Sequence, residues 1–207
     1  IRRQRQMCIR DRYNTFEKLM KAISKSLKKN DPNHLNLGIR YGYIEQLDDE
    51  LLRISKESFD ALSFNCYALS PDHEKMNHAL EISGLPMIIG EYHFGTVDRG
   101  LAQSLWQVNS QKERGDAFRY YTENAFAHRG LIGTGWFRWI DQNINGRTDG
   151  ENYNCGFIDV TDRPYPYMVD AAIETAKSLY EIHSGTKTPF HQAPNAVGHS
   201  PIPDLWE

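Results

Sequence analysis

The chain has 207 residues, of which 40% are hydrophobic and 12% aromatic, so it is long enough to bury a sizeable core. Its formal net charge is −3, and no acidic or basic block interrupts the body of the chain. These properties exclude the basic face that nucleic-acid binding needs, and no run approaches the roughly 20 apolar residues of a membrane span.

The first twelve residues differ in character from the rest. The segment IRRQRQMCIRDR holds five arginines and one aspartate, and it resembles the translated read-through of a sequencing adaptor. We therefore leave residues 1–12 out of the predicted fold and expect the natural protein to begin upstream of them. The alternative is a natural basic arm that binds an acidic partner.

From residue 13 the sequence predicts helices that alternate with short strands. Apolar residues recur at helical spacing before the breaker at 30–33, and Ser70 with Pro71 is typical of a helix start. The expected elements up to residue 82 are a helix at 13–29, a strand at 34–41, a helix at 47–56, a strand at 59–67 and a helix at 70–82.

The second part of the chain continues the alternation, with longer connections. Its expected elements are a strand at 87–91, a loop at 92–110, a helix at 111–127, a strand at 131–140, a polar loop at 141–162 and a helix at 167–182. The proline-containing tail at 184–207 is expected to be poorly ordered.

This order of elements predicts an α/β fold. Strands that alternate with helices call for parallel strands joined by right-handed crossovers. The long loops follow strands and never helices, as in a barrel enzyme whose site lies on the C-terminal face. A whole (β/α)8 barrel needs roughly 250 residues and eight strands, so residues 13–183 are interpreted as half of a TIM barrel. A doubly wound nucleotide-binding sheet is the alternative, but no glycine-rich phosphate loop follows any strand.

Glu91 is the first candidate for chemistry, because it lies at the end of a strand within the run PMIIGEYHF at 86–94. A barrel presents catalytic groups at the C-terminal ends of its strands. The preceding Gly90 would let a backbone or a substrate approach closely. The alternative is a structural ion pair between Glu91 and Arg40 or Arg138, but the barrel context favours catalysis.

Further candidates stand at the ends of neighbouring strands. Asn65 and Tyr67 close the second strand, where Tyr67 would either donate a hydrogen bond to Glu91 or lie at the rim of the site. Alternation along the fourth strand places Trp139 and Asp141 on the same face. Trp139 lies at the end of that strand, where an aromatic platform for a sugar would be needed.

No metal site is predicted. The segment 141–152 begins like an EF-hand loop, but Asn152 replaces the bidentate glutamate of position twelve and the preceding element is a strand. His73 and His78 are five residues apart, which is not the i, i+4 spacing of zinc ligands on a helix. The three cysteines fit no CxxC pattern.

Four motifs carry a family resemblance. They are GEYHFGTVDRG at 90–100, QKERG at 111–115, GTGWFRWIDQ at 133–142 and GRTDGENYNCGFIDVTDRPYP at 146–166. Together they resemble agarase-type retaining glycoside hydrolases, which belong to the clan of (β/α)8 glycosidases that also holds β-galactosidases. The similarity runs over most of the chain and is most specific around the first, third and fourth motifs.

The resemblance implies a role for each strand end. Glu91 falls on the catalytic nucleophile at the end of strand seven, Trp139 on the aromatic floor at strand eight, and Asn65 and Tyr67 at the end of strand six. The chain would thus cover strands five to eight, the C-terminal half of the barrel. The other substrate-binding residues expected are His93, Asp141, Gln142, Glu151 and Asn152.

The resemblance also implies an activity and the absence of one catalytic residue from this sequence. The expected reaction is retaining cleavage of β-galactosidic bonds in an agar-like galactan, without a cofactor, by a secreted or periplasmic protein. Clan members carry the acid/base glutamate in an Asn-Glu pair at the end of strand four, and this chain contains no Asn-Glu dipeptide. We therefore expect that residue to lie upstream and the chain alone to be inactive.

Two other functions are compatible with the same motifs. A β-galactosidase of the same clan would share all of them. A non-catalytic carbohydrate-binding pseudoenzyme would keep Trp139 and bind oligosaccharide without turnover.

Overall fold

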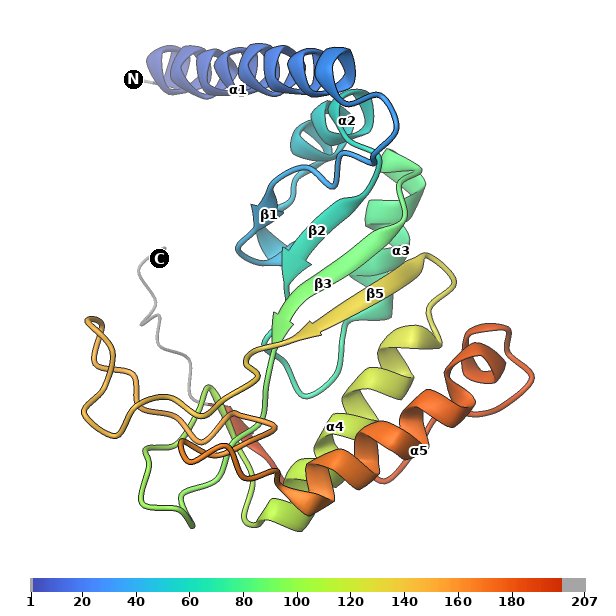
Figure 1. Ribbon diagram of the computed structural model, residues 1–207. Coiled ribbons are helices and arrows are strands. Elements are labelled where there is room, and N and C mark those ends of the chain that lie inside the picture. The colour runs from blue at the N-terminus through green and yellow to red at the C-terminus, as the bar shows by residue number, and fades with distance from the viewer. Residues whose placement is uncertain (1, 199–207) are drawn as a thin grey trace.

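A computed structural model describes residues 2–198 of the protein and shows a parallel sheet of four strands (Figure 1). Spatial order follows chain order, and each strand pairs in parallel with the next. The strands are β1 (Arg40–Tyr41), β2 (Leu62–Asn65), β3 (Met87–Tyr92) and β5 (Leu131–Trp136). The predicted parallel α/β arrangement is therefore confirmed.

Helices connect and cover these strands. Figure 1 shows α3 and α4 on the same side of the sheet, with α5 alongside α4 and the long loops after β3 and β5 gathered beyond the carboxyl ends of those strands. The helices are α1 (Arg2–Asn30), the short 3-10 helix η1 (Ile44–Gln46), α2 (Asp49–Ser58), α3 (His73–Ser83), α4 (Gln111–Phe126) and α5 (Pro166–His183). No helix within residues 2–198 is long and apolar enough to cross a membrane.

The core lies between the sheet and this helical layer. Met87 and Ile89 of β3 are fully buried, and Tyr92 at the end of the strand stacks on Tyr121 of α4 with ring centroids 4.0 Å apart. The hydroxyl of Tyr92 also bonds that of Thr122, at 2.5 Å. These contacts anchor β3 to α4 and so fix the position of the residues at the carboxyl end of β3.

The boundaries of several elements differ from the sequence prediction. The strand expected at 34–41 is reduced to β1, and the strand expected at 131–140 ends at Trp136. Helix α3 begins later than predicted, because Asp72 rather than Ser70 caps it: the Asp72 carboxylate accepts hydrogen bonds from the backbone N–H of Glu74 and of Lys75. Capping and strand pairing determine where these elements begin and end. Local hydrophobic periodicity carries little information about either.

Helix α1 begins at Arg2, so it extends through the segment that the sequence analysis set aside. It packs on α2 through one face that includes the buried Met20, whereas Leu19, Ile23 and Leu27 are exposed. The adaptor interpretation of residues 1–12 stays a prediction.

Part of the predicted tail has defined partners. The backbone N–H of Phe190 donates to Glu123 of α4 at 2.8 Å. The short strand β6 (Val197–Gly198) pairs in antiparallel fashion with β4 (Trp106–Gln107) in the loop after β3. The rest of the tail, residues 199–207, lies outside the described residues.

Candidate active site

The carboxylate of Glu91 is the centre of a polar cluster at the carboxyl edge of the sheet. Its Oε1 lies 2.8 Å from the Arg40 guanidinium. Its Oε2 accepts one hydrogen bond from the Tyr67 hydroxyl at 2.8 Å and another from the Asn65 amide at 3.0 Å. The Glu91 side chain is 18% exposed, so a substrate could still reach it. A guanidinium, a phenol and an amide all donate here, which is an environment built for an ionised carboxylate.

A bulge in β3 aims Glu91 at this cluster. Met87 and Ile89 are buried, and strict alternation would put Glu91 on the same buried face. The strand register skips Gly90, however: Phe64 pairs with Ile89, and the next residue of β2 pairs with Glu91. One extra residue reverses the alternation, so Tyr92 takes the buried position and Glu91 turns to the opposite face.

Gly90 also makes room for the ion pair. A Cβ at this position would overlap the Cδ of Arg40 and lie 3.2 Å from Oδ1 of Asn65. The glycine thus lets the Arg40 side chain cross the backbone of β3 and reach Glu91. The close approach expected at Gly90 is confirmed, and the approaching group is an arginine side chain.

Tyr67 is held as a proton donor. Burial, together with the hydrogen bond to Glu91 and the charge of that carboxylate, raises the pKa of Tyr67 far above its usual range. The phenol therefore keeps its proton at any physiological pH, and the predicted bond between Tyr67 and Glu91 is confirmed. The ion pair with Arg40, which the sequence analysis kept as the alternative role for Glu91, is present as well.

His93 does not offer a polar atom to a substrate. Its side chain is buried, its Nδ1 lies 3.0 Å from the carbonyl oxygen of Phe137, and its Nε2 accepts from the backbone N–H of Leu105 at 3.1 Å. Burial lowers the pKa of His93 to about 3, so the ring is neutral. The direct substrate contact predicted from the sequence does not fit a histidine whose two nitrogens are both engaged.

Asp141 also has a different role from the predicted one. It is buried, and its carboxylate accepts from the Asn154 amide at 2.9 and 3.0 Å, from the backbone N–H of Gly156 at 2.7 Å and from the Tyr165 hydroxyl at 2.6 Å. The predicted alternation failed here because β5 ends before this residue. Asp141 organises the loop after β5 and has no lone pair facing solvent for a sugar hydroxyl.

A buried arginine completes this second cluster. Arg114 of α4 donates to the side-chain oxygen Oδ1 of Asn154 at 2.9 Å and to the backbone oxygen of Gly156, and its guanidinium lies 4.6 Å from the centroid of the Tyr165 ring. Asn154 therefore bridges the charges of Arg114 and Asp141. Sequence reasoning missed Arg114 and Asn154, although an arginine among the apolar positions of a helix could have indicated a buried charge.

Trp139 is the most exposed aromatic residue near this loop. It is 69% exposed, and its ring stacks on that of Phe157 with centroids 5.8 Å apart and an interplanar angle of 18°. One face of the indole is thus supported while the rest is open to solvent. This is the arrangement of a platform on which a sugar ring could stack.

The remaining predicted residues lie on the loop between β5 and α5. Gln142 is buried and donates to Glu151 at 2.7 Å, while Glu151 also pairs with Arg147 at 3.3 Å. The amide of Asn152 donates to the backbone oxygen of Ile144 at 3.4 Å. Glu151 and Asn152 are partly exposed, so sugar binding by these two residues remains a prediction.

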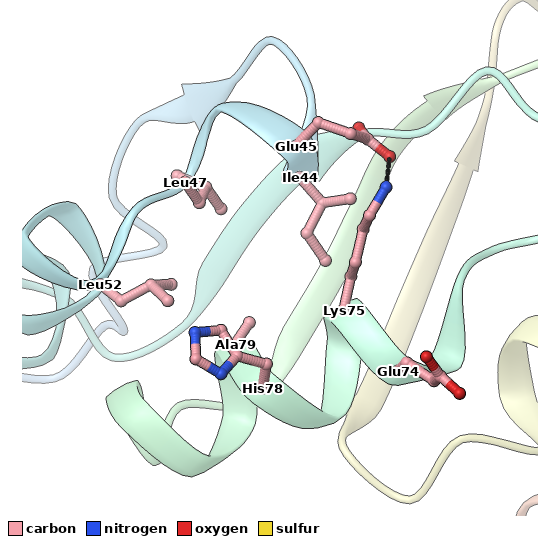
Figure 2. Close-up of a pocket in the computed structure, with 8 residues that line it drawn as sticks. All are labelled: Ile44, Glu45, Leu47, Leu52, Glu74, Lys75, His78 and Ala79. Carbon is pink, nitrogen blue, oxygen red and sulfur yellow. Dashed lines mark hydrogen bonds and ion pairs between the residues drawn. The ribbon is translucent and has the colours of Figure 1, made fainter.

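A separate hollow of about 340 Å³ lies between η1, α2 and α3 (Figure 2). Its floor is apolar, and Figure 2 shows the Glu45–Lys75 ion pair, at 3.0 Å, along one side. It shares no lining residue with the Glu91 cluster. Among residues 2–198, no group of three or more His, Cys, Asp or Glu side chains is arranged to hold a metal ion.

Comparison with known proteins identifies relatives of the chain. No family model matches it. It is 36% identical to beta-agarase A of Vibrio sp. (strain JT0107) over 166 residues, which are 77% of this chain and 16% of that protein. It is 34% identical to beta-agarase B of the same strain over 170 residues, 79% of this chain and 17% of that protein.

Solved structures agree with this relationship. The chain superposes on the crystal structure of an agarase, AgWH50C, with a TM-score of 0.76 and 36% identity, over 81% of this chain and 26% of that one. The chain therefore spans about a sixth of the length of the curated relatives that it matches. These similarities confirm the relationship to agarase-type glycoside hydrolases, and the four-stranded sheet is part of an α/β barrel.

Proposed function

We propose that this chain forms strands five to eight of a retaining β-glycoside hydrolase that cleaves agar-like galactan, with Glu91 as the nucleophile. The observation that carries the proposal is the Glu91 carboxylate, which a bulge turns out of the core into a partly exposed cluster of three donors. The two curated relatives are named beta-agarases, which supports an agar-like galactan as the substrate.

The two oxygens of Glu91 are suited to different tasks. Oε2 is occupied by the Tyr67 and Asn65 donors, whereas within residues 2–198 Oε1 bonds only to Arg40, whose side chain is 51% exposed. Oε1 would attack the anomeric carbon: the new carbon–oxygen bond forms as the bond to the leaving oxygen breaks. Tyr67 and Asn65 hold the other oxygen and so orient the carboxylate throughout.

The leaving oxygen needs a proton, and in this proposal the proton comes from a group outside this chain. Retaining glycosidases place a second carboxyl about 5–5.5 Å from the nucleophile, which first donates a proton and then activates water. We place that group outside this sequence, which has no Asn-Glu dipeptide. The chain alone is therefore expected not to hydrolyse galactan.

Substrate would be held beside Glu91 by the loop after β5. Trp139, supported by Phe157, provides the stacking surface, and Glu151 with Asn152 provides partners for hydroxyl groups. His93, Asp141 and Gln142, all of them buried, act by supporting this loop. Because polymeric galactan does not cross membranes, the enzyme would be secreted or periplasmic.

A substrate with a very good leaving group tests the nucleophile without the missing acid. Dinitrophenolate leaves without protonation, so a dinitrophenyl 2-deoxy-2-fluoro-β-galactoside should transfer its fluorosugar to Glu91 while the fluorine slows hydrolysis of the ester. Intact-mass spectrometry should show one added fluorogalactosyl group, and peptide mapping should place it on Glu91.

Two variants make the labelling result decisive. Glu91→Gln should abolish labelling, whereas Glu81→Gln, which changes an exposed glutamate on α3, should label like the parent chain. Circular dichroism checks that both variants fold. Absence of label from the folded parent chain, or undiminished labelling of Glu91→Gln, would overturn the proposal.

A further inference from the structure

His93 adds a side-chain link between two parts of the candidate site. Its ring connects the end of β3, which carries Glu91, to Phe137, which begins the segment that carries Trp139. The backbone N–H of Phe137 also donates to the Tyr92 oxygen at 2.9 Å. The start of the Trp139 segment is therefore attached to β3 at two adjacent points.

The hydrogen bonds of the ring define its protonation state. The N–H of Leu105 can only donate, so Nε2 of His93 must be the unprotonated nitrogen. Nδ1 then carries the proton and donates it to the Phe137 carbonyl. Because burial lowers the pKa of His93 to about 3, this tautomer persists over the whole range in which the protein would work.

The ring also supports the phenol that holds Glu91. The His93 and Tyr67 rings meet edge to face with centroids 4.9 Å apart, and the Tyr67 hydroxyl donates to Glu91 Oε2. On another side the ring lies against Tyr153, with centroids 5.9 Å apart. A shift of this imidazole would therefore move both the donor to Glu91 and the neighbouring loop.

We propose that His93 is a positioning residue that sets the place of the Trp139 segment relative to Glu91 and thereby determines sugar binding in this site. The consequence for sugar binding rests on the proposed function; the mechanical link between the two segments does not. The bond to Phe137 is the one that matters for the position of Trp139, and the bond to Leu105 serves the loop after β3.

Two substitutions separate these bonds. In His93→Asn, the side-chain amide can occupy the place of Nδ1 and donate to the Phe137 carbonyl, but it leaves the Leu105 N–H without its acceptor. In His93→Gln, the longer amide can reach the place of Nε2 and accept from Leu105, but the Phe137 carbonyl loses its donor. The two variants thus remove one hydrogen bond each from the same buried residue.

Hydrogen exchange tests the mechanical link in the full chain without ligand. The backbone N–H groups of Phe157 and Ile158 both donate to the Trp139 oxygen, so their protection reports on the position of that segment. We expect faster exchange at these amides in His93→Gln and near-parent exchange in His93→Asn. As a matched control, His183→Gln removes a different histidine bonded to a backbone carbonyl and should leave them unchanged.

Binding of an agar-derived tetrasaccharide, measured by calorimetry, tests the functional consequence. His93→Gln should bind about tenfold more weakly than the parent, a change of roughly 1.4 kcal/mol, and His93→Asn within about threefold of it. A purely structural role would lower the melting temperature of both variants without separating their affinities.

The two measurements distinguish the possible failures. Equal exchange at Phe157 and Ile158 in the two variants would overturn the positioning role, whatever the binding data show. An exchange difference between the two variants, together with a parent chain that does not bind the tetrasaccharide, would support the mechanical link and count against the proposed function. Equal affinities in two variants that differ in exchange would overturn the role in sugar binding.

Discussion

Glu91 lies near the end of β3 and Asp141 follows the neighbouring parallel strand β5, yet they have opposite environments. Glu91 is partly exposed and paired with side chains that lie on, or just after, the two preceding strands. Asp141 is buried and bonded to an amide, a backbone N–H and a phenol from the loop around it. A carboxylate near a strand end is thus a site residue or a structural residue according to what surrounds it.

The difference begins in the backbone. The bulge at Gly90 lies near the end of β3, where the strand is still paired with both neighbours, and it turns Glu91 away from the helical layer. At Asp141 the strand has already ended, so the chain is free to turn inward and bury the carboxylate beside Asn154. A bulge within a paired strand turns Glu91 towards solvent, and the end of strand pairing allows Asp141 to be buried within a loop.

The largest expected difference between the two carboxylates is in stability. Asp141→Ala would leave Asn154, Gly156 and the Tyr165 hydroxyl without their acceptor and remove the negative charge that acts most strongly on Arg114, so it should lower the free energy of unfolding by about 3–5 kcal/mol. Glu91→Ala leaves the Tyr67 hydroxyl and the Asn65 amide without this acceptor, but it frees an Arg40 that is half exposed and can be hydrated, so its cost should be smaller, about 1–2 kcal/mol. Urea titrations that give similar losses for the two variants would contradict this comparison.

An effect of intermediate size is expected on stability at acidic pH, and it comes from His93, which lies between the two regions. The pKa of His93 is lowered to about 3 in the folded chain, below the roughly 6.5 of an unfolded histidine. Below pH 6.5 the unfolded chain therefore binds a proton that the folded chain does not, and stability is lost progressively as pH falls from 6.5 towards 3. Between pH 4 and 6, unfolding of the parent chain should take up about one proton more than unfolding of His93→Gln.

The measurement is the slope of the unfolding free energy against pH, compared between the two chains. Carboxylates shared by both chains contribute equally to the two slopes and cancel in the comparison. Equal slopes would mean that His93 titrates normally in the folded state, which would contradict its burial.

The smallest expected effect is at the bulge itself. In Gly90→Ala the added Cβ would displace the flexible Arg40 side chain, so the ion pair with Glu91 should be lost while stability changes by less than about 1 kcal/mol. Nuclear magnetic resonance of the Arg40 guanidinium would report the loss. Gly133→Ala, where the Cβ would meet only Ile88 at 3.7 Å, is the matched control and should leave that signal unchanged.

Local patterns in the sequence predicted much of the candidate site. The order of helices and strands follows from apolar periodicity, and β3 and α4 differ from their predicted bounds by one residue each. Because parallel strands end at one edge of a sheet, the bond from Tyr67 to Glu91 was one of two roles predicted for Tyr67, and the structure confirms it. Asn65 was placed at the same strand end, and its bond to Glu91 is an addition from the structure. The alternative partner Arg40 was also named from its place at the end of the first strand.

The roles of His93 and Asp141 could not be predicted in this way. Their partners are backbone groups and side chains distant in sequence: Leu105 and Phe137 for His93, and Tyr165 for Asp141. A polar residue beside a strand end has the same local signature whether water or a folded loop satisfies its hydrogen bonds. Only the complete path of the loops distinguishes the two cases.

The sequence by itself determined the alternation of elements, the edge at which the functional groups meet and the identity of the carboxylate at that edge, because these depend on periodicities of two and 3.6 residues that the chain carries locally. The tertiary structure alone decided which polar side chains reach solvent, since burial depends on pairing between segments that are far apart. The bulge at Gly90 turns Glu91 to the opposite face of the sheet, and the early end of β5 lets Asp141 be buried in a loop. Together they separate a candidate nucleophile from a buried support.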